Sequence, residues 1–239
     1  WNNVYRHNGK TYEIGQHGFA RDMDFERVHQ TEDEITYRLE STDETLSKFP
    51  FPFELGISYQ LKGNRVIVKW QVRNPGSEPM PFQIGAHPAF YFPSFQAEAF
   101  DKGFFSFDHT SGLEYISPKE KGCSSPERHL LTLNEEGLMP INLQTFHCDT
   151  YIFDNHQLSK VTLLSVEKQP VVSLEFNAPL VALWSPTVAH PDCPFVCIEP
   201  WYGRCDAVGY EGDWKDREWM QQLAPRESFH ATYSILIED

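Results

Sequence analysis

The sequence is poor in the features that mark nucleic-acid and membrane proteins. Only 20 of its 239 residues are Lys or Arg, against 34 Asp or Glu, and the formal net charge is −14. A DNA- or RNA-binding surface needs clustered basic residues, and this sequence has no such cluster. No apolar run approaches the length of about 18 residues that suggests a bilayer-spanning helix. We therefore expect no nucleic-acid partner and no membrane partner.

Signatures of nucleotide and metal cofactors are missing as well. The chain has no GxGxxG fingerprint, no P-loop and no His-x-His pair of the kind found in cupin metal sites. Its five cysteines are odd in number and include no CxxC, although Cys193 and Cys197 lie close together. The first residues show no secretory signal. We predict free thiols, a cytoplasmic location, and neither a cofactor nor a structural metal.

Alternation of apolar and polar residues is the dominant pattern in the chain. A period of two is typical of strands with one buried face, and these segments are rich in β-branched and aromatic residues. Gly63 and Asn64 predict a two-residue hairpin turn of the II′ type, and a second strand pair turns around Gln169 and Pro170. The predicted strands cover residues 34–42, 53–62, 65–74, 160–168, 171–177, 180–185, 195–200 and 230–238.

Helix signals are sparse. Residues 43–50 could form one turn before Pro50, and residues 213–223 predict a short helix with Asp213 near its N-terminal cap. Neither segment has the apolar stripe of a core helix. No linker or internal repeat divides the chain. We predict an all-β fold, a large antiparallel β-sandwich that residues 1–239 form as one domain.

Histidine and glutamate side chains in two motifs are the first candidates for chemistry, because an imidazole and a carboxyl group can move protons at neutral pH. His87 lies in GAHPAF, where Pro88 favours an extended backbone. Glu199 lies in IEPWYG, at the expected end of an apolar strand, where burial would raise its pKa toward that of a useful base. Taken locally, the same patterns also fit a core histidine and a strand-end glutamate exposed to water.

Four further residues are candidates for substrate binding. His17 opens HGFARD, a predicted tight bend in which Arg21 and Asp22 could pair with each other. Asp149 precedes a short apolar strand and could bind a hydroxyl group or cap a turn. Trp201 is placed to form a stacking wall for a sugar ring. The predicted binding set is therefore His17, Arg21, Asp149 and Trp201.

The three motifs, in this order, resemble those of the aldose 1-epimerases, also called galactose mutarotases. The resemblance is closer to the bacterial galactose mutarotase-related branch, and it runs from about Gly9 to Tyr233. It implies an antiparallel sandwich that binds a sugar in an open cleft on one sheet. Family members usually carry several dozen residues before the first motif, including a substrate-binding arginine, whereas 16 residues precede His17 here. We therefore expect that the chain lacks an N-terminal segment, and neither Arg6 nor Arg21 is assumed to replace that arginine.

The resemblance also implies roles for individual residues. By motif, His87 matches the general acid of the family and Glu199 its general base. His17 matches the histidine that hydrogen-bonds the sugar, and Asp149 matches the aspartate that binds a hydroxyl group. In better-known members the acid histidine lies in an Asn-His-x-Tyr-Phe run, but here the run is Ala-His-Pro-Ala-Phe. This departure leaves the identity of the aldose open.

The expected reaction interconverts the α and β anomers of a free aldose such as galactose or glucose. Glu199 takes the proton from O1 while protonated His87 gives one to the ring oxygen O5, and the C1–O5 bond opens. Rotation about C1–C2 and reversal of the steps give the other anomer. The chemistry needs no cofactor. We expect the acid and the base on opposite sides of the sugar, each within about 3 Å of its oxygen.

Three other functions fit parts of the sequence. A hexose-6-phosphate 1-epimerase would need a basic pocket, for which Arg21, Arg204 and scattered lysines are the plausible donors. A non-catalytic carbohydrate-binding protein would use the aromatic residues alone. A glycoside hydrolase would pair Glu199 with Asp149 or Asp206, at a separation of about 5–5.5 Å or 6.5–9.5 Å. As partners we expect a monosaccharide substrate, and we expect the protein to be a monomer or a homodimer.

Overall fold

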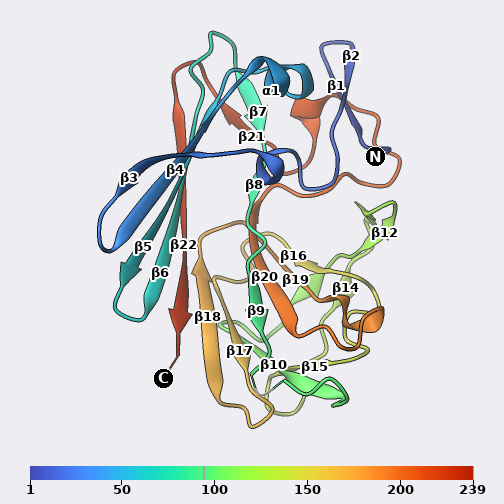
Figure 1. The fold of residues 1–239 in the computed structure, drawn as a ribbon. Coiled ribbons are helices and arrows are strands. Elements are labelled where there is room, and N and C mark those ends of the chain that lie inside the picture. The colour runs from blue at the N-terminus through green and yellow to red at the C-terminus, as the bar shows by residue number, and fades with distance from the viewer. Residues whose placement is uncertain (94, 239) are drawn as a thin grey trace.

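Two antiparallel sheets pack face to face and form a sandwich (Figure 1). The computed structural model describes residues 1–93 and 95–238. The larger sheet has nine strands in the order β15 (Met139–Asn142), β10 (Asp101–Phe107), β17 (Lys160–Leu164), β18 (Pro170–Phe176), β22 (Ser228–Ile237), β6 (Arg65–Arg73), β5 (Glu54–Lys62), β4 (Glu34–Glu40) and β3 (Glu26–Gln30). The smaller sheet has the order β16 (Tyr151–Phe153), β19 (Leu180–Trp184), β20 (Phe195–Tyr202) and β8 (Ile84–Gly85), with β9 (Ala89–Tyr91) also paired to β20.

Short elements connect and flank these sheets. The two-stranded sheets are β1 (Val4–His7) with β2 (Lys10–Glu13), β11 (Glu114–Tyr115) with β14 (His129–Leu130), β12 (Pro118–Glu120) with β13 (Cys123–Ser124), and β7 (Met80–Phe82) with β21 (Gln221–Leu223). The helices are α1 (Asp43–Lys48) and the 3₁₀ turns η1 (Ala20–Asp22), η2 (Pro186–Val188) and η3 (Trp214–Asp216). Within residues 1–93 and 95–238, none of the helices has the length and apolar character needed to cross a membrane.

The main hydrophobic core fills the space between the two sheets. Leu174 of the larger sheet and Val196 and Ile198 of the smaller sheet all belong to it, and each is essentially inaccessible to solvent. Because successive side chains of a strand point to opposite faces, Cys197 and Glu199 project from the other face of the smaller sheet. The core therefore fixes the direction in which β20 presents these two side chains.

All eight predicted strands are present, and the all-β antiparallel sandwich predicted from the sequence is confirmed. The strand ends differ from the prediction by a few residues. Gly63 has a φ of +60°, whereas Asn64 is not among the residues with positive φ, as a II′ turn between β5 and β6 requires. Residues 43–48 form α1, which ends before Pro50 and begins with a capping box made by Thr42 and Thr45.

Two local predictions were wrong. The turn between β17 and β18 lies at residues 165–169, where Lys168 takes a positive φ, and Pro170 instead begins β18. The predicted helix at residues 213–223 is limited to the single 3₁₀ turn η3, although Asp213 does cap it. Its last three residues become β21, because their backbone pairs with β7 and Leu223 is buried in a second hydrophobic core. Tertiary pairing outweighed a weak helical pattern there.

Candidate active site

Glu199 lies inside strand β20 and not at its end, as the sequence had suggested. The strand continues through Pro200 to Tyr202, and Glu199 pairs with Ala182 of β19. The residue is 2 % exposed, because the neighbouring strands and the His87 segment cover it. The Glu199 carboxyl group is thus almost fully desolvated on a strand that has paired neighbours on both sides.

Proline is tolerated within β20 because the pairing of this strand is interrupted on the side away from β19, where β8 and β9 are separate strands. The N–H of Ile198 points to the β9 side, where it donates to the carbonyl oxygen of Pro88 at 3.3 Å. Alternation places the missing N–H of Pro200 on the same side, at the gap between β8 and β9. His87 lies in this gap, between the end of β8 and the start of β9.

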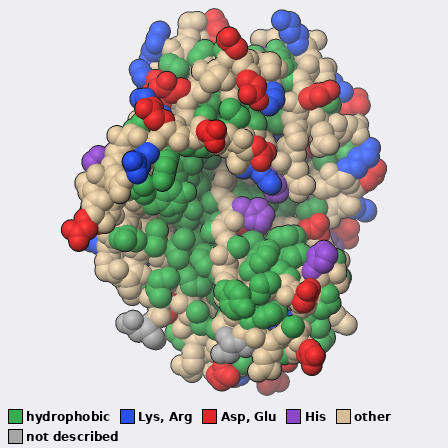
Figure 2. Space-filling model, viewed as in Figure 1, with side chains coloured by type: hydrophobic (Ala, Val, Ile, Leu, Met, Phe, Trp, Pro, Cys, Tyr) green, Lys and Arg blue, Asp and Glu red, His purple; other side chains and the backbone are tan. Residues whose placement is uncertain are grey.

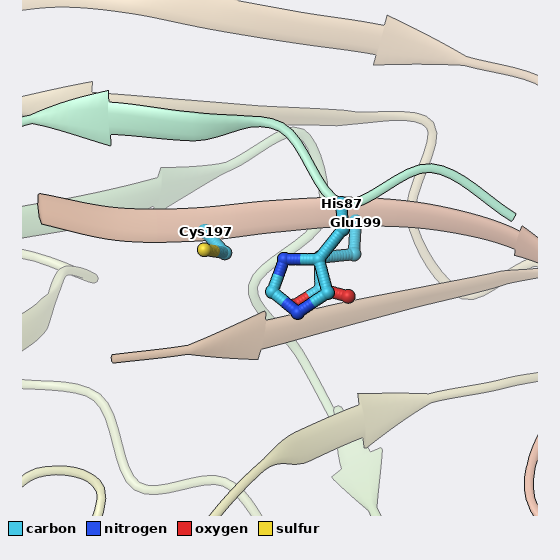
Figure 3. Close-up of side chains that lie close together, drawn as sticks. All are labelled: His87, Cys197 and Glu199. Atoms are coloured by element: carbon cyan, nitrogen blue, oxygen red, sulfur yellow. The ribbon is translucent and has the colours of Figure 1, made fainter. Parts of the chain in front are cut away.

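His87 sits in that gap, and hydrogen bonds on both sides fix its segment to β20. The N–H of Ala86 donates to the carbonyl oxygen of Pro200 at 3.1 Å, and Pro88 accepts from Ile198. Figure 3 shows the imidazole lying over β20, close to Glu199. The Nε2 atom of His87 is 3.4 Å from Oε1 of Glu199, while the imidazole side chain keeps 41 % of its surface exposed.

The close approach of these two groups corrects the expectation that they lie on opposite sides of a sugar. A separation of 3.4 Å leaves no room for a sugar ring between them. They form a side-by-side pair, with Glu199 as the buried member and His87 facing solvent. A ligand can therefore meet both groups only from one side.

Burial displaces the pKa values of the pair in opposite directions. Desolvation raises the pKa of Glu199 to about 8; the Trp201 indole opposes part of this rise and the charge of Asp149 adds to it. For His87, burial lowers the pKa, and the nearby His17 and Arg21 lower it further. Between these two pKa values, the pair as a whole carries one proton.

His17 joins the pair from an element far away in the sequence. Its ring lies 5.3 Å from that of His87, centroid to centroid, and the two planes are nearly perpendicular at 86°. His17 adopts a positive φ of +66°, and Gly18 follows with +68°, which gives the tight bend that the sequence predicted. Burial, and next the charge of Arg21, lowers the pKa of His17.

Arg21 lies at the edge of this group of side chains. It forms an exposed ion pair with Asp22, at 3.6 Å, as the sequence suggested. Its charge acts on both imidazoles. The structure therefore brings His17, Arg21, His87 and Glu199 into one region.

Asp149 and Trp201 lie beside Glu199, and each also has a structural partner. Asp149 has a positive φ of +72° and accepts a hydrogen bond from the Thr150 hydroxyl at 2.8 Å. The Trp201 indole N–H donates to the carbonyl oxygen of Ala86 at 3.2 Å. A predicted role for either residue in sugar binding stays a prediction, but both contribute to the electrostatics around the Glu199 carboxyl group.

Two residues of the site were missed from the sequence. The ring of Trp184 lies 5.8 Å from that of His87, at 85° to it, and Trp184 pairs with Cys197 in the sheet. Cys197 lies two residues before Glu199 and is 1 % exposed. The sequence alone could have identified Cys197, since residues two apart on a strand share a face. Identifying Trp184, however, also required the register between β19 and β20.

Other features of the sequence lie away from this site. Asp206 pairs with Arg217, at 2.5 Å, and so belongs to a separate, partly buried ion pair. A cavity of about 390 Å³ is lined by residues such as Tyr115, Asn142 and His147 and includes none of the predicted site residues. All five cysteines have free thiols.

The face that Figure 2 shows is hollowed between strand β22 and strand β8 of Figure 1. Hydrophobic side chains gather in the hollow, and histidine side chains lie at its edge. A concave apolar surface with a few polar groups is typical of small-molecule sites.

Comparison with known proteins gives a consistent result. Residues 2–234 match the family model described as aldose 1-epimerase. The plasmid-encoded protein LacX of Lactococcus lactis subsp. lactis is 28% identical over 233 residues, which cover 94% of this chain and 75% of LacX.

Solved structures agree. The galactose mutarotase related enzyme of Lactobacillus acidophilus is similar with a TM-score of 0.88 and 31% identity, covering 100% of this chain and 79% of that protein. The galactose mutarotase-like protein of Lactobacillus casei has a TM-score of 0.90 and 27% identity, covering 99% and 80%. Because the family model matches nearly the whole length of the sequence, this chain belongs to the aldose 1-epimerase family.

Proposed function

We propose that the protein is an aldose 1-epimerase that interconverts the α and β anomers of a free aldose such as galactose or glucose. One observation carries the proposal: an exposed imidazole lies 3.4 Å from a buried carboxyl group, His87 against Glu199. Family membership supports an isomerase of this class. The geometry explains how two such groups could act on one carbon atom.

The side-by-side arrangement suits a hemiacetal. The two oxygens that exchange protons, O1 and O5, are both bonded to C1, and they lie closer together than the length of one hydrogen bond. An acid and a base that act on them can therefore be neighbours. Both groups can then approach O1 and O5 from the same side of the sugar, and their contacts with the substrate can tighten when it binds.

The proposed reaction uses the single proton of the pair. In the reactive form Glu199 is ionised and His87 is protonated. Glu199 accepts the proton of O1 as His87 donates to O5, and the C1–O5 bond breaks to give the open-chain aldehyde. Rotation about C1–C2 exposes the other face of C1, and reversal of the transfers closes the ring. In the open-chain state the proton of the pair is on Glu199, and ring closure returns it to His87, so the cycle balances.

The surrounding residues would position the sugar. We assign hydrogen bonding of the substrate to His17, Asp149 and Arg21, which lie near the pair. Trp201 would contribute an aromatic wall, and the Trp184 ring beside His87 could do the same. The substrate is a neutral monosaccharide whose ring can rest on an apolar surface.

Two substitutions test the proposed roles directly. Glu199→Gln and His87→Asn each remove one proton-transfer group with little change in shape. Because one such transfer is typically worth about 10²–10⁴ in rate, we expect each variant to lose at least a hundredfold in catalysed mutarotation, measured by polarimetry. The matched controls are Glu32→Gln and His109→Asn, which change exposed residues of the same types. Full activity in either site variant, with a circular dichroism spectrum like that of the wild type, would contradict the assigned role.

Phosphorylated aldoses are a second candidate substrate class, because of one observation. Arg21 is exposed, and its charge acts on both His17 and His87. A guanidinium group in this place could contact a phosphate. Comparing hexoses with hexose 6-phosphates in the same assay separates the two classes. A phosphorylated substrate predicts that Arg21→Gln raises KM for the hexose 6-phosphate far more than KM for the free hexose.

A further inference from the structure

The side chains of Cys197 and Glu199 leave strand β20 on the same face, and the imidazole of His87 lies over that strand (Figure 3). One potential ligand atom from each of the three residues lies within 4.8 Å of the other two. We propose that His87, Cys197 and Glu199 form a binding site for a thiophilic divalent cation such as Zn²⁺, and that occupation of this site inhibits the enzyme. The inhibition rests on the proposed function, whereas the binding does not.

The ligand set selects the kind of cation. A thiolate, an imidazole and a carboxylate together match Zn²⁺ and Co²⁺, whereas Mg²⁺ and Ca²⁺ prefer sites made of oxygen atoms alone. Three protein ligands leave one position of a tetrahedral ion for water. His87 is 41 % exposed, so the ion can reach the two buried ligands from the imidazole side.

The backbone geometry makes the site nearly complete before any ion binds. Cys197 and Glu199 are held two residues apart on a paired strand, and the Ala86 and Pro88 hydrogen bonds fix the His87 segment to that strand. Zinc lies about 2.0–2.3 Å from such ligands, so tetrahedral ligand atoms are roughly 3.3–3.8 Å apart. His87 and Glu199 already fit this range at 3.4 Å. Rotation of the Cys197 and His87 side chains would close the remaining distance.

Binding of the cation would remove the groups that the reaction needs. The metal takes a lone pair of Glu199 and one of His87, so the first cannot accept a proton and the second cannot donate one. The Cys197 thiol loses its proton to solvent as the sulfur–metal bond forms, and the His87–Glu199 pair releases the one proton that it carries. A chelator would reverse the inhibition, because removal of the metal lets these side chains take the protons up again.

Cobalt offers a readout that is independent of catalysis. Co²⁺ uses the same ligands as Zn²⁺, and a thiolate bound to Co²⁺ gives a charge-transfer band in the near ultraviolet. We expect chelator-treated wild-type protein to develop this band at one equivalent of Co²⁺. The Cys197→Ser variant should lack the band. The Cys123→Ser variant should retain it, because this matched control removes another buried thiol, on β13 and outside the site.

Zinc inhibition of mutarotation is the second measurement. For each protein the rate is normalised to its own rate without metal, and we expect Cys197→Ser to need at least tenfold more Zn²⁺ for half inhibition. Absence of the cobalt band in wild-type protein would overturn the proposal without reference to any variant, and so would its persistence in Cys197→Ser. If the wild-type protein shows the cobalt band but has no mutarotase activity, the metal site is supported and only the proposed function is rejected.

Discussion

At the scale of single residues, Glu199 is placed where its ionised form is costly. It is 2 % exposed, and burial raises its pKa to about 8. A protein has little reason to bury an acid on a core strand for stability, because the desolvation cost of the ionised form must then be met by other interactions. Strongly displaced pKa values are common where groups exchange protons with a substrate. The imidazole at 3.4 Å supplies the partner for such an exchange.

The displaced pKa values predict a bell-shaped pH profile. The reactive form, with Glu199 ionised and His87 protonated, is a constant fraction of the singly protonated pair, so activity requires a pH between the two macroscopic pKa values. We expect kcat/KM to fall as pH rises through about 8, where Glu199 loses its proton. It should also fall in acid, below the ordinary histidine pKa, because burial lowers the pKa of His87. Polarimetric rates from pH 5 to pH 10 measure both limbs, and catalysed activity that keeps rising between pH 8 and pH 10 would contradict the one-proton form.

At the scale of elements, the site depends on how β8 and β9 flank β20. A Cβ atom on Gly85 would lie 2.6 Å from Cδ1 of Trp201, so the glycine permits the close approach of β8 to β20. The Trp201 indole N–H holds the carbonyl oxygen of the next residue, Ala86. His87 directly follows Ala86. The contacts of Trp201 with Gly85 and Ala86 therefore bring β8 and β20 together and also fix the His87 imidazole over the Glu199 carboxyl group.

Gly85→Ala tests this coupling between packing and catalysis. The added methyl group must push Trp201 or β8 away, which we expect to cost about 1–3 kcal/mol of stability and to lower kcat by at least tenfold. Urea unfolding and polarimetry measure the two effects. Gly56→Ala on β5 is the control, because its Cβ would meet only ordinary contacts at 3.8 Å or more. An active Gly85→Ala enzyme with wild-type kcat would show that the β8 contact does not position His87.

The elements also show how far the sequence alone can lead. Strands and the Gly63–Asn64 hairpin were predicted because alternation and turn residues are local signals. The conformation of residues 213–223 was not predicted correctly, because it depends on pairing between β21 and β7, which are far apart in the chain. His87 and Glu199 were found from their motifs. Their side-by-side contact and the nearby Trp184 depend on the register of β20 with its neighbours, which no local pattern contains.

At the scale of the whole molecule, the buried acid links stability to pH. In the unfolded chain the Glu199 pKa is near 4.5, and in the folded protein it is about 8. Below pH 4.5 the group is protonated in both states and has no unfavourable effect. As pH rises from 4.5 to 8, only the unfolded state ionises, so folding stability falls by up to about 4–5 kcal/mol in total.

Glu199→Gln should remove this dependence. We expect the Tm of the variant to rise relative to that of the wild type as pH increases from 5 to 8, measured by thermal unfolding at each pH. The Glu32→Gln control changes an exposed residue and should show no such trend. A difference between Glu199→Gln and wild type that stays constant over this pH range would mean that the carboxyl group is not held protonated by burial.

Exchange spectroscopy by NMR tests most directly whether this molecule catalyses anomer exchange. The α and β anomers of galactose, glucose and their 6-phosphates are each brought to equilibrium, and exchange cross-peaks between the anomeric protons are recorded with and without protein. For at least one of these sugars, we predict an exchange rate that rises in proportion to the concentration of wild-type protein and returns to the spontaneous rate with Glu199→Gln. Exchange at the spontaneous rate for every sugar, or undiminished exchange with the variant, would contradict the account.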